Sequence, residues 1–399
     1  MAVPLAAIET ELEKLWKSVA QEARRAARSA AENGIDASAA SPAAGISRAR
    51  VLNFVTYASA KADASMDGES AVDIVGRVVA THPFRSILIV ADESDGAVEI
   101  SATVRALARD GTDGRKIVHE QVRIDARGPV SAGLPSVVLP LLLPDLPTFL
   151  WWPGDPPINH AFWPRMVDAC DHLILESSAF SSPLGSLSLY ADFVQVSGRH
   201  HTFGDLAWNQ LAEWRSLVSQ FFDNPACADC IEQIASVAID YAVRQPAGTG
   251  HTRQPNPGVA LLLAGWLCAR LNWDVMSSQS EQGMVRYQLK ARDGHRLDLV
   301  LKPRISTGPP AAIECVRIDT GAGEQDAHFA VERDRDKPVA HVTASLPDSG
   351  GVARSVSLAI GDRATLLAKE LDQGMQDRPY EEAVAATGVL ARKAYESRT

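Results

Sequence analysis

Short apolar runs alternate with amphipathic stretches in the first half of the chain. Apolar residues recur at helical spacing over residues 4–33, which predicts one amphipathic helix, and an Ala/Ser/Pro-rich linker follows at 34–47. The predicted strands share a β-branched, apolar composition and lie at 51–58, 85–91, 97–107, 116–124, 148–152 and 172–177. Predicted helices lie between them at 69–80, 129–143 and 159–168. Alternation of strands and helices indicates an α/β domain with a central mixed sheet at 48–180.

The second half begins with helical periodicity and then changes to strand alternation. Helices are predicted at 183–223, with one break near 198–204, at 231–243 and at 257–272, which gives a helical middle segment at 181–275. Alternating strands punctuated by Gly, Asp and Pro then follow at 284–291, 295–303, 311–319, 326–333 and 338–346. Two helices, at 362–373 and 379–395, close the chain.

The pattern as a whole predicts the fold class α/β, divided into four parts. These are an N-terminal helix and linker at 1–47, an α/β domain at 48–180, a helical segment at 181–275, and an α+β domain with an antiparallel sheet at 276–399. A chain of 399 residues is long enough to bury a large core without disulfides.

Composition and charge narrow the function classes. The net charge of -10 and the lack of a Lys/Arg-rich run argue against a nucleic-acid partner. No apolar run approaches the ~20 residues of a membrane span, and the N-terminus lacks the features of a signal peptide. Five widely spaced cysteines do not resemble a secreted disulfide framework. We therefore expect a cytoplasmic protein that binds neither nucleic acid nor membrane.

Catalytic and cofactor motifs are missing from the sequence. It has no GxxxxGK[ST] phosphate loop, no GxGxxG, no HExxH and no GxSxG. We expect no cofactor and no metal. The sharpest chemical motif is Cys227-Ala-Asp-Cys230. A structural role is the favoured interpretation, while a redox pair or half of a zinc site remains open.

A proline- and tryptophan-rich segment is the most unusual stretch of the chain. Residues 139–157, LPLLLPDLPTFLWWPGDPP, hold six prolines, which restrict the backbone around Trp151 and Trp152. Neighbouring residues at a strand end face opposite sides, so one Trp can enter the core while the other reaches a surface or cleft. Trp163 and Arg165 follow closely, and aromatic and Arg side chains are enriched at binding hot spots.

The segment 204–222, GDLAWNQLAEWRSLVSQFF, has the features of a capped amphipathic helix. Asp205 is a suitable N-cap, and an apolar stripe follows it. Trp208 and Arg215 lie on an adjoining stripe, seven residues apart, and are further candidates for a contact surface.

Four stretches of this chain resemble one family. THPFRSILIV, LPLLLPDLPTFLWWPGDPP, GDLAWNQLAEWRSLV and LLLAGWLCARLNW, in this order over residues 81–273, are similar to the OpcA family of glucose-6-phosphate dehydrogenase assembly proteins. The resemblance implies a non-catalytic, allosteric activator that binds glucose-6-phosphate dehydrogenase and promotes its active oligomer in the pentose phosphate pathway. The candidate partner-binding residues are Arg85, Trp151, Trp152, Trp163, Arg165, Trp208 and Arg215.

Two points keep alternatives open. In cyanobacterial members the resemblance implies a redox switch through cysteines near the C-terminus, whereas no cysteine follows Cys315 here. The chain could also be a sugar-phosphate-binding enzyme with a site around Arg85, Asp155 and Arg165, or a metabolite-sensing module.

Overall fold

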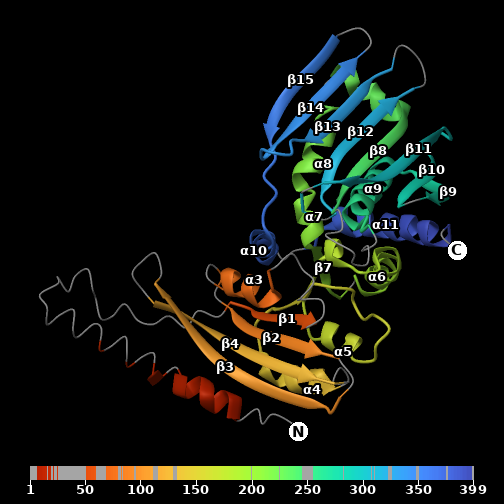
Figure 1. Cartoon of the computed structure of the whole chain (residues 1–399). Coiled ribbons are helices and arrows are strands. Elements are labelled where there is room, and N and C mark those ends of the chain that lie inside the picture. The colour runs from red at the N-terminus through yellow and green to blue at the C-terminus, as the bar shows by residue number, and fades with distance from the viewer. Residues whose placement is uncertain are drawn as a thin grey trace, which may run out of the picture. The chain divides into compact units, whose positions relative to one another are not determined.

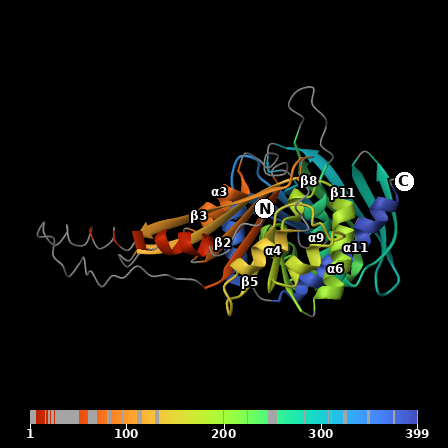
Figure 2. The ribbon, with the colours of Figure 1, turned by 90° about the horizontal axis from the view of Figure 1, so that it is seen from below.

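The chain forms two compact units, drawn together in Figure 1 and from below in Figure 2. The computed structural model describes residues 7–15, 17–18, 21, 25, 51–59, 69–79, 82, 84–93, 96–110, 116–128, 133–198, 200–223, 225–244, 255–281, 283–306, 308–309, 311–321, 326–346, 350–373 and 376–397. Unit 1 comprises Met1–Ile174 and Arg363–Gln373, and unit 2 comprises Leu175–Asp362 and Gly374–Thr399. The expected division into four parts remains a prediction.

Unit 1 is built on a mixed sheet. Its strands lie in the order β3-β4-β2-β1-β5-β6. Parallel pairing joins β4, β2, β1 and β5, whereas β3 runs antiparallel to β4. The strands coincide with the apolar runs that predicted them: β1 Asn53–Ser59, β2 Arg85–Asp92, β3 Glu99–Asp110, β4 Lys116–Arg127, β5 Thr148–Trp152 and β6 His172–Leu175.

Helices cover both faces of this sheet. Figure 1 shows α3 (Ala71–Val78) and α10 (Arg363–Gln373) on one face and the short α4 (Leu134–Val138) and α5 (Trp163–Val167) on the other. A capping box between Ser70 and Asp73 starts α3. Prolines within 134–147 limit the predicted helix at 129–143 to α4 and one turn of 3-10 helix, η2 (Leu139–Leu141).

The described part of the predicted N-terminal helix is helical. Residues 7–15, 17–18, 21 and 25 have helical backbone, and Ile8 and Leu12 are buried. Most of the remaining residues of 4–33, and the linker at 34–47, lie outside the described residues.

The order of the strands produces a switch point in the sheet. The chain passes from β1 to β2 on one side of β1, and β5 later joins the other side. In open α/β sheets, ligands bind outside the carboxyl ends of the strands at such a point. The carboxyl ends of β1 and β5 are therefore the first place to search for a site in unit 1.

Unit 2 contains an eight-stranded sheet in the order β15-β14-β13-β12-β8-β11-β10-β9. Its strands are β8 Ile234–Val243, β9 Asp274–Glu281, β10 Met284–Lys290, β11 Arg296–Ile305, β12 Ile313–Thr320, β13 His328–Arg333, β14 Val339–Leu346 and β15 Gly350–Ser357. The predicted α+β class is confirmed, but the sheet is mixed, because β8 pairs in parallel with β11 and antiparallel with β12. The polar, largely exposed β9 and β15 lack the apolar alternation that would have predicted them.

The predicted helix at 231–243 is wrong, because this segment forms β8. Its buried residues Ile234, Val237 and Tyr241 are spaced as on one face of a helix, and only Val237 and Tyr241 also fit the alternation of a strand. Pairing with β11 and β12 on both sides decides in favour of the strand, and Ile239 completes the buried alternation. Short apolar runs are ambiguous in this way when only a long-range partner selects the structure.

The other elements of unit 2 are close to those predicted. They are η3 Ser177–Ala179, α6 Pro183–Ser197, α7 Leu206–Gln210, α8 Ala212–Ser219, η4 Pro225–Gln233, α9 Gly258–Leu271 and α11 Arg378–Glu396. The break near 198–204 contains a short strand, β7 Thr202–Asp205. Asp205 caps α7 as predicted, with its carboxylate accepting a hydrogen bond from the Ala207 backbone N–H at 2.8 Å.

Glycines allow three helices of unit 2 to approach closely. A Cβ on Gly265 of α9 would collide with Thr387 of α11, and a Cβ on Gly388 of α11 would collide with Ala191 of α6. Gly76 of α3, in contrast, has no atom within 4 Å of the position its Cβ would occupy.

We predict opposite effects for two glycine-to-alanine changes. Gly388→Ala should lower stability by about 1–3 kcal/mol through overpacking against α6. Gly76→Ala should raise stability by about 0.5–1 kcal/mol, because alanine has less conformational entropy than glycine in the unfolded chain and its Cβ meets no clash here. Thermal unfolding of both variants beside the natural chain measures this. An unchanged or raised melting temperature for Gly388→Ala would contradict the packing described here.

Candidate functional site

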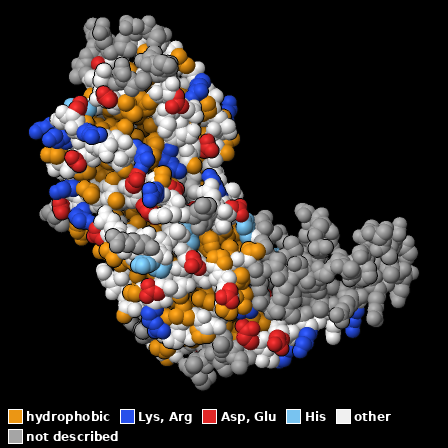
Figure 3. All heavy atoms as spheres, turned by 180° about the vertical axis from the view of Figure 1, so that it is seen from behind, with side chains coloured by type: hydrophobic (Ala, Val, Ile, Leu, Met, Phe, Trp, Pro, Cys, Tyr) orange, Lys and Arg blue, Asp and Glu red, His pale blue; other side chains and the backbone are white. Residues whose placement is uncertain are grey.

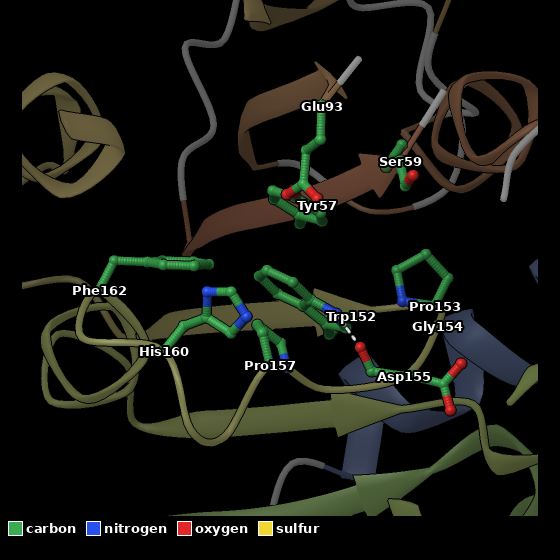
Figure 4. A pocket seen from close by; sticks show the side chains of 11 residues that line it. Tyr57, Ser59, Glu93, Trp152, Pro153, Gly154, Asp155, Pro157, His160 and Phe162 are labelled. Carbon is green, nitrogen blue, oxygen red and sulfur yellow. Dashed lines mark hydrogen bonds between the residues drawn. The ribbon is translucent and has the colours of Figure 1, made fainter. Parts of the chain in front are cut away.

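A pocket lies at the switch point of unit 1, at the carboxyl ends of β1 and β5 (Figure 4). Its volume is about 220 Å³. The residues that line this switch-point pocket come from β1, from the end of β2 and from the loop after β5: Tyr57, Ala58, Ser59, Glu93, Trp152, Pro153, Gly154, Asp155, Pro157, His160 and Phe162. A volume of this size is below the ~300–1,000 Å³ of typical ligand pockets, so a dinucleotide does not fit.

A stack of two aromatic rings forms the floor of the pocket. The rings of Trp152 and Tyr57 lie nearly parallel, with their centroids 3.8 Å apart and an interplanar angle of 6°. The register of β1 and β5 causes this contact, because Thr56 pairs with Trp151 and the next residue of each strand then points to the same face. Trp163 contacts Trp152 edge-on at 5.1 Å from behind.

Hydrogen bonds fix both rings of the stack. The Tyr57 hydroxyl donates to the Glu93 carboxylate at 2.8 Å, and the Trp152 indole N–H donates to the Asp155 carbonyl oxygen at 3.1 Å. Burial raises the pKa of the Tyr57 hydroxyl, and the bond to Glu93 and its charge raise it further, so the group stays protonated at neutral pH. Pro153 and Pro157 restrict the loop that carries Asp155.

The charge of the pocket is negative. Glu93 and Asp155 contribute carboxylates, and none of the described residues that line the pocket is Lys or Arg. His160 is the one basic side chain among them. Figure 4 shows Ser59 and His160 on opposite sides of the pocket, so they do not form a nucleophile and base pair. The described lining residues thus offer carboxylates, one imidazole and aromatic rings, and no Lys or Arg that would bind a phosphate.

The Pro/Trp segment places its two central tryptophans on opposite faces of the sheet, as the alternation predicted. Trp152 faces the pocket, whereas Trp151 stacks on Phe54 at 6.5 Å and lies 5.7 Å from the guanidinium of Arg363 on α10. Both side chains are buried: the exposed fraction is 0% for Trp151 and 4% for Trp152. Trp163 is also buried, while Arg165 is exposed on α5.

Arg85 lies at the amino end of β2, away from the pocket. Its guanidinium is buried and forms an ion pair with Glu120 at 2.9 Å and another with Glu9 at 3.1 Å. It also donates to the Leu141 carbonyl oxygen at 3.0 Å. Arg85 therefore connects three segments of unit 1 and has almost no surface to offer a partner.

Trp208 and Arg215 form a pair in unit 2. The Arg215 guanidinium lies 3.2 Å above the centre of the Trp208 ring, and the indole N–H of Trp208 donates to Asp377 at 2.8 Å. Burial lowers the pKa of Arg215 to about 10, which Asp377 partly offsets. This pair fixes the start of α11 on α7, and Trp208 is 3% exposed.

The Cys227-Cys230 motif lies in the 3-10 helix η4. Cys227 is buried, and burial, followed by the neighbouring Cys230, raises the pKa of its thiol. A raised pKa disfavours the thiolate that disulfide exchange requires. Within the described ranges, no group of three or more His, Cys, Asp or Glu residues could hold a metal ion.

Several pocket residues gave no signal in the sequence. Tyr57, Glu93 and Phe162 belong to ordinary strand and loop stretches, and only the pairing of β1 with β2 and β5, together with the loop after β5, brings them to Trp152. The proline-rich loop was the one signal in the sequence, and it pointed to Trp152 and Asp155. Basic and acidic side chains are interspersed on the face drawn in Figure 3, without one continuous basic area.

Fold and pocket together define a two-unit α/β protein with a small acidic crevice at the switch point of its first sheet. Two family models match the sequence of the chain. One, described as the glucose-6-phosphate dehydrogenase subunit N-terminal domain, covers residues 76–192, and the other, described as the C-terminal domain of the same subunit, covers residues 201–384. The chain belongs to this OpcA family of glucose-6-phosphate dehydrogenase assembly proteins.

Curated relatives carry the same family name. The chain is 24% identical to "Putative OxPP cycle protein OpcA" of Synechococcus elongatus, over 80% of this chain and 71% of that protein. It is 28% identical to the protein of that name from Nostoc punctiforme, over 47% of this chain, and that match spans 43% of the relative's length.

Solved structures with a related arrangement are distant. A levoglucosan dehydrogenase complex with NADH and levoglucosan aligns with a TM-score of 0.47 at 11% identity, over 87% of this chain and 96% of that one. At these values the likeness carries no functional argument. None of the helices in the described part of the chain is both long and apolar enough to cross a membrane.

We predict that Trp151 and Arg165 differ in what their removal affects. Trp151→Ala should lower stability by about 3–5 kcal/mol, because it empties a fully buried site between Phe54 and α10. Arg165→Ala, on the exposed side of α5, should change stability by less than about 0.5 kcal/mol. Circular dichroism melting of the two variants gives the comparison. Equal melting temperatures would contradict the burial described for Trp151.

We predict that the cysteine pair has no redox function. Should the chain activate glucose-6-phosphate dehydrogenase, the double variant Cys227→Ser and Cys230→Ser should activate it to the same extent under oxidising and reducing conditions, because burial raises the pKa of the Cys227 thiol. Activation assays after treatment with oxidant or reductant test this. A redox response in the natural chain that the double variant lacks would contradict it.

Proposed function

We propose that this chain is a non-catalytic assembly factor that binds glucose-6-phosphate dehydrogenase and raises its activity by favouring the active oligomer. The observation that carries the proposal is the match of family models to both units, over residues 76–192 and 201–384. The chain acts in the same compartment as the dehydrogenase, the cytoplasm, and supports the oxidative pentose phosphate pathway.

The switch-point pocket supports a role without catalysis. In a doubly wound sheet this is the place where a nucleotide would bind, usually over a Gly-rich turn and a helix N-terminus. Here the sequence lacks GxGxxG, and Trp152 and Tyr57 fill the crevice with stacked rings. The remaining volume, about 220 Å³, is suited to a side chain or a small molecule.

A sugar-phosphate enzyme is less consistent with this geometry. Its candidate residues do not converge, since Arg85 lies at the amino end of the eight-residue β2 while Asp155 lines a pocket at the carboxyl edge of the sheet. A strand of that length separates the two ends by about 25 Å. Phosphate binding also needs cations or N–H donors, whereas the pocket contributes carboxylates.

Activation then follows from differential affinity. If the chain binds the active oligomer of the dehydrogenase more tightly than its inactive form, it shifts the population by that difference, typically ~1–3 kcal/mol or about 5- to 150-fold. The effect is largest when substrate is scarce, because saturating substrate already selects the active form.

We predict activation without turnover. The purified chain alone should produce no NADPH from glucose 6-phosphate, and it should raise the rate of the cognate dehydrogenase at least about 5-fold at subsaturating substrate. Initial rates and sedimentation velocity, with and without the chain, measure both effects. An unchanged rate together with an unchanged oligomer size would overturn the proposal, and turnover by the chain alone would favour the enzyme alternative.

A further inference from the structure

We propose that the switch-point pocket is an acceptor site for an arginine side chain of a protein partner. The inference rests on the proposed function, because it assigns the chemistry of the partner group that this pocket receives. It starts from three properties of the described lining residues, namely aromatic walls, two carboxylates and a small volume.

The aromatic walls favour a planar cation. Trp152, Tyr57 and Phe162 line one cavity, and ring faces attract a guanidinium or ammonium through their quadrupole. A guanidinium, unlike an ammonium, also stacks flat on an aromatic ring. Elsewhere in this chain Arg215 makes such a contact with Trp208, with the guanidinium carbon 3.2 Å from the ring centre.

The carboxylates supply the charge that a guanidinium requires. Glu93 is exposed at the rim, and the hydrogen bond that it accepts from the Tyr57 hydroxyl at 2.8 Å holds it over the aromatic stack (Figure 4). Asp155 lies on the opposite side of the opening in the same view. An arginine entering between them can contact the exposed part of an aromatic ring and donate to a carboxylate at once, which is the combination that makes arginine a frequent hot-spot residue.

The same features exclude other occupants. An anionic group, whether a sugar phosphate or a nucleotide, would meet two carboxylates and no Lys or Arg among the described lining residues. The volume of about 220 Å³ accommodates one long side chain, and it is too small for a helix or a dinucleotide.

The pocket is rigid before anything binds. Trp152 is fixed by its bond to the Asp155 carbonyl oxygen and by the edge of Trp163, and Pro153 and Pro157 restrict the loop. Groups that are already ordered lose little entropy when a partner docks, so even a single side chain contributes measurably to affinity.

The first test uses the full chain without any dehydrogenase. Indole ¹⁵N–H signals are followed by NMR during titration with N-acetyl-arginine amide and with N-acetyl-citrulline amide, which has the same shape without the charge. We expect the arginine probe to shift the Trp152 signal saturably and to bind at least about 10-fold more tightly than the citrulline probe. Equal binding of the two probes, or a shift by inorganic phosphate, overturns the inference.

Matched variants assign the binding to the pocket. Glu93→Gln removes the rim charge and should weaken the arginine probe about 5- to 10-fold, and Tyr57→Phe should weaken it less, because it only frees the carboxylate to move. Glu232→Gln makes the same charge change at an exposed position of η4 in unit 2 and should leave binding unchanged. If Glu93→Gln binds the probe as tightly as Glu232→Gln does, the inference fails.

A second experiment separates this inference from the proposed function. Glu93→Gln should need about 5- to 10-fold more protein than Glu232→Gln for half-maximal activation of the dehydrogenase. The natural chain could activate the dehydrogenase while the two variants show equal half-maximal concentrations. This result would overturn the arginine site and leave the proposed function standing. If the natural chain does not activate the dehydrogenase, the proposed function is overturned. The probe titration still tests the arginine site in that case.

Discussion

The stack of Trp152 on Tyr57 is the contact on which the candidate site depends. It exists because β1 and β5 pair in parallel at the point where the strand order reverses, so the last residues of both strands face the same crevice. Two fixed rings in that crevice occupy the space that a nucleotide would need. What remains is a small pocket whose described lining residues include two carboxylates and no Lys or Arg, and this chemistry favours recognition of a cation over an anion.

The sequence predicted the two units unequally. Most elements of unit 1 could be predicted, because its strands are short β-branched runs separated by helices. The unusual composition of the Pro/Trp segment pointed to Trp152 and its loop. In unit 2 the segment that forms β8 was predicted as a helix, because Ile234, Val237 and Tyr241 fall at helical spacing. The strand forms through pairing with β11 and β12, which are more than fifty residues away in sequence.

The candidate site residues could also be predicted only in part from the sequence. Composition marks Trp and Arg as potential hot spots, yet it does not tell a buried anchor from an exposed contact. Arg85 and Trp151 are fully enclosed and stabilise unit 1, whereas Arg165 is exposed. Tyr57 and Glu93 were missed because their role arises only from the register of β1 with β5 and the end of β2. The family description, in turn, names glucose-6-phosphate dehydrogenase, but it does not locate a contact surface.

The central claim is that the chain binds the dehydrogenase through the switch-point pocket. Hydrogen–deuterium exchange of the full chain, with and without the cognate dehydrogenase, tests it most directly. The account predicts slower exchange on binding in the peptides that carry residues 57–59 and 152–162, whose backbone forms the pocket wall. Complex formation with unchanged exchange in both of these peptides would place the partner surface elsewhere and contradict the account.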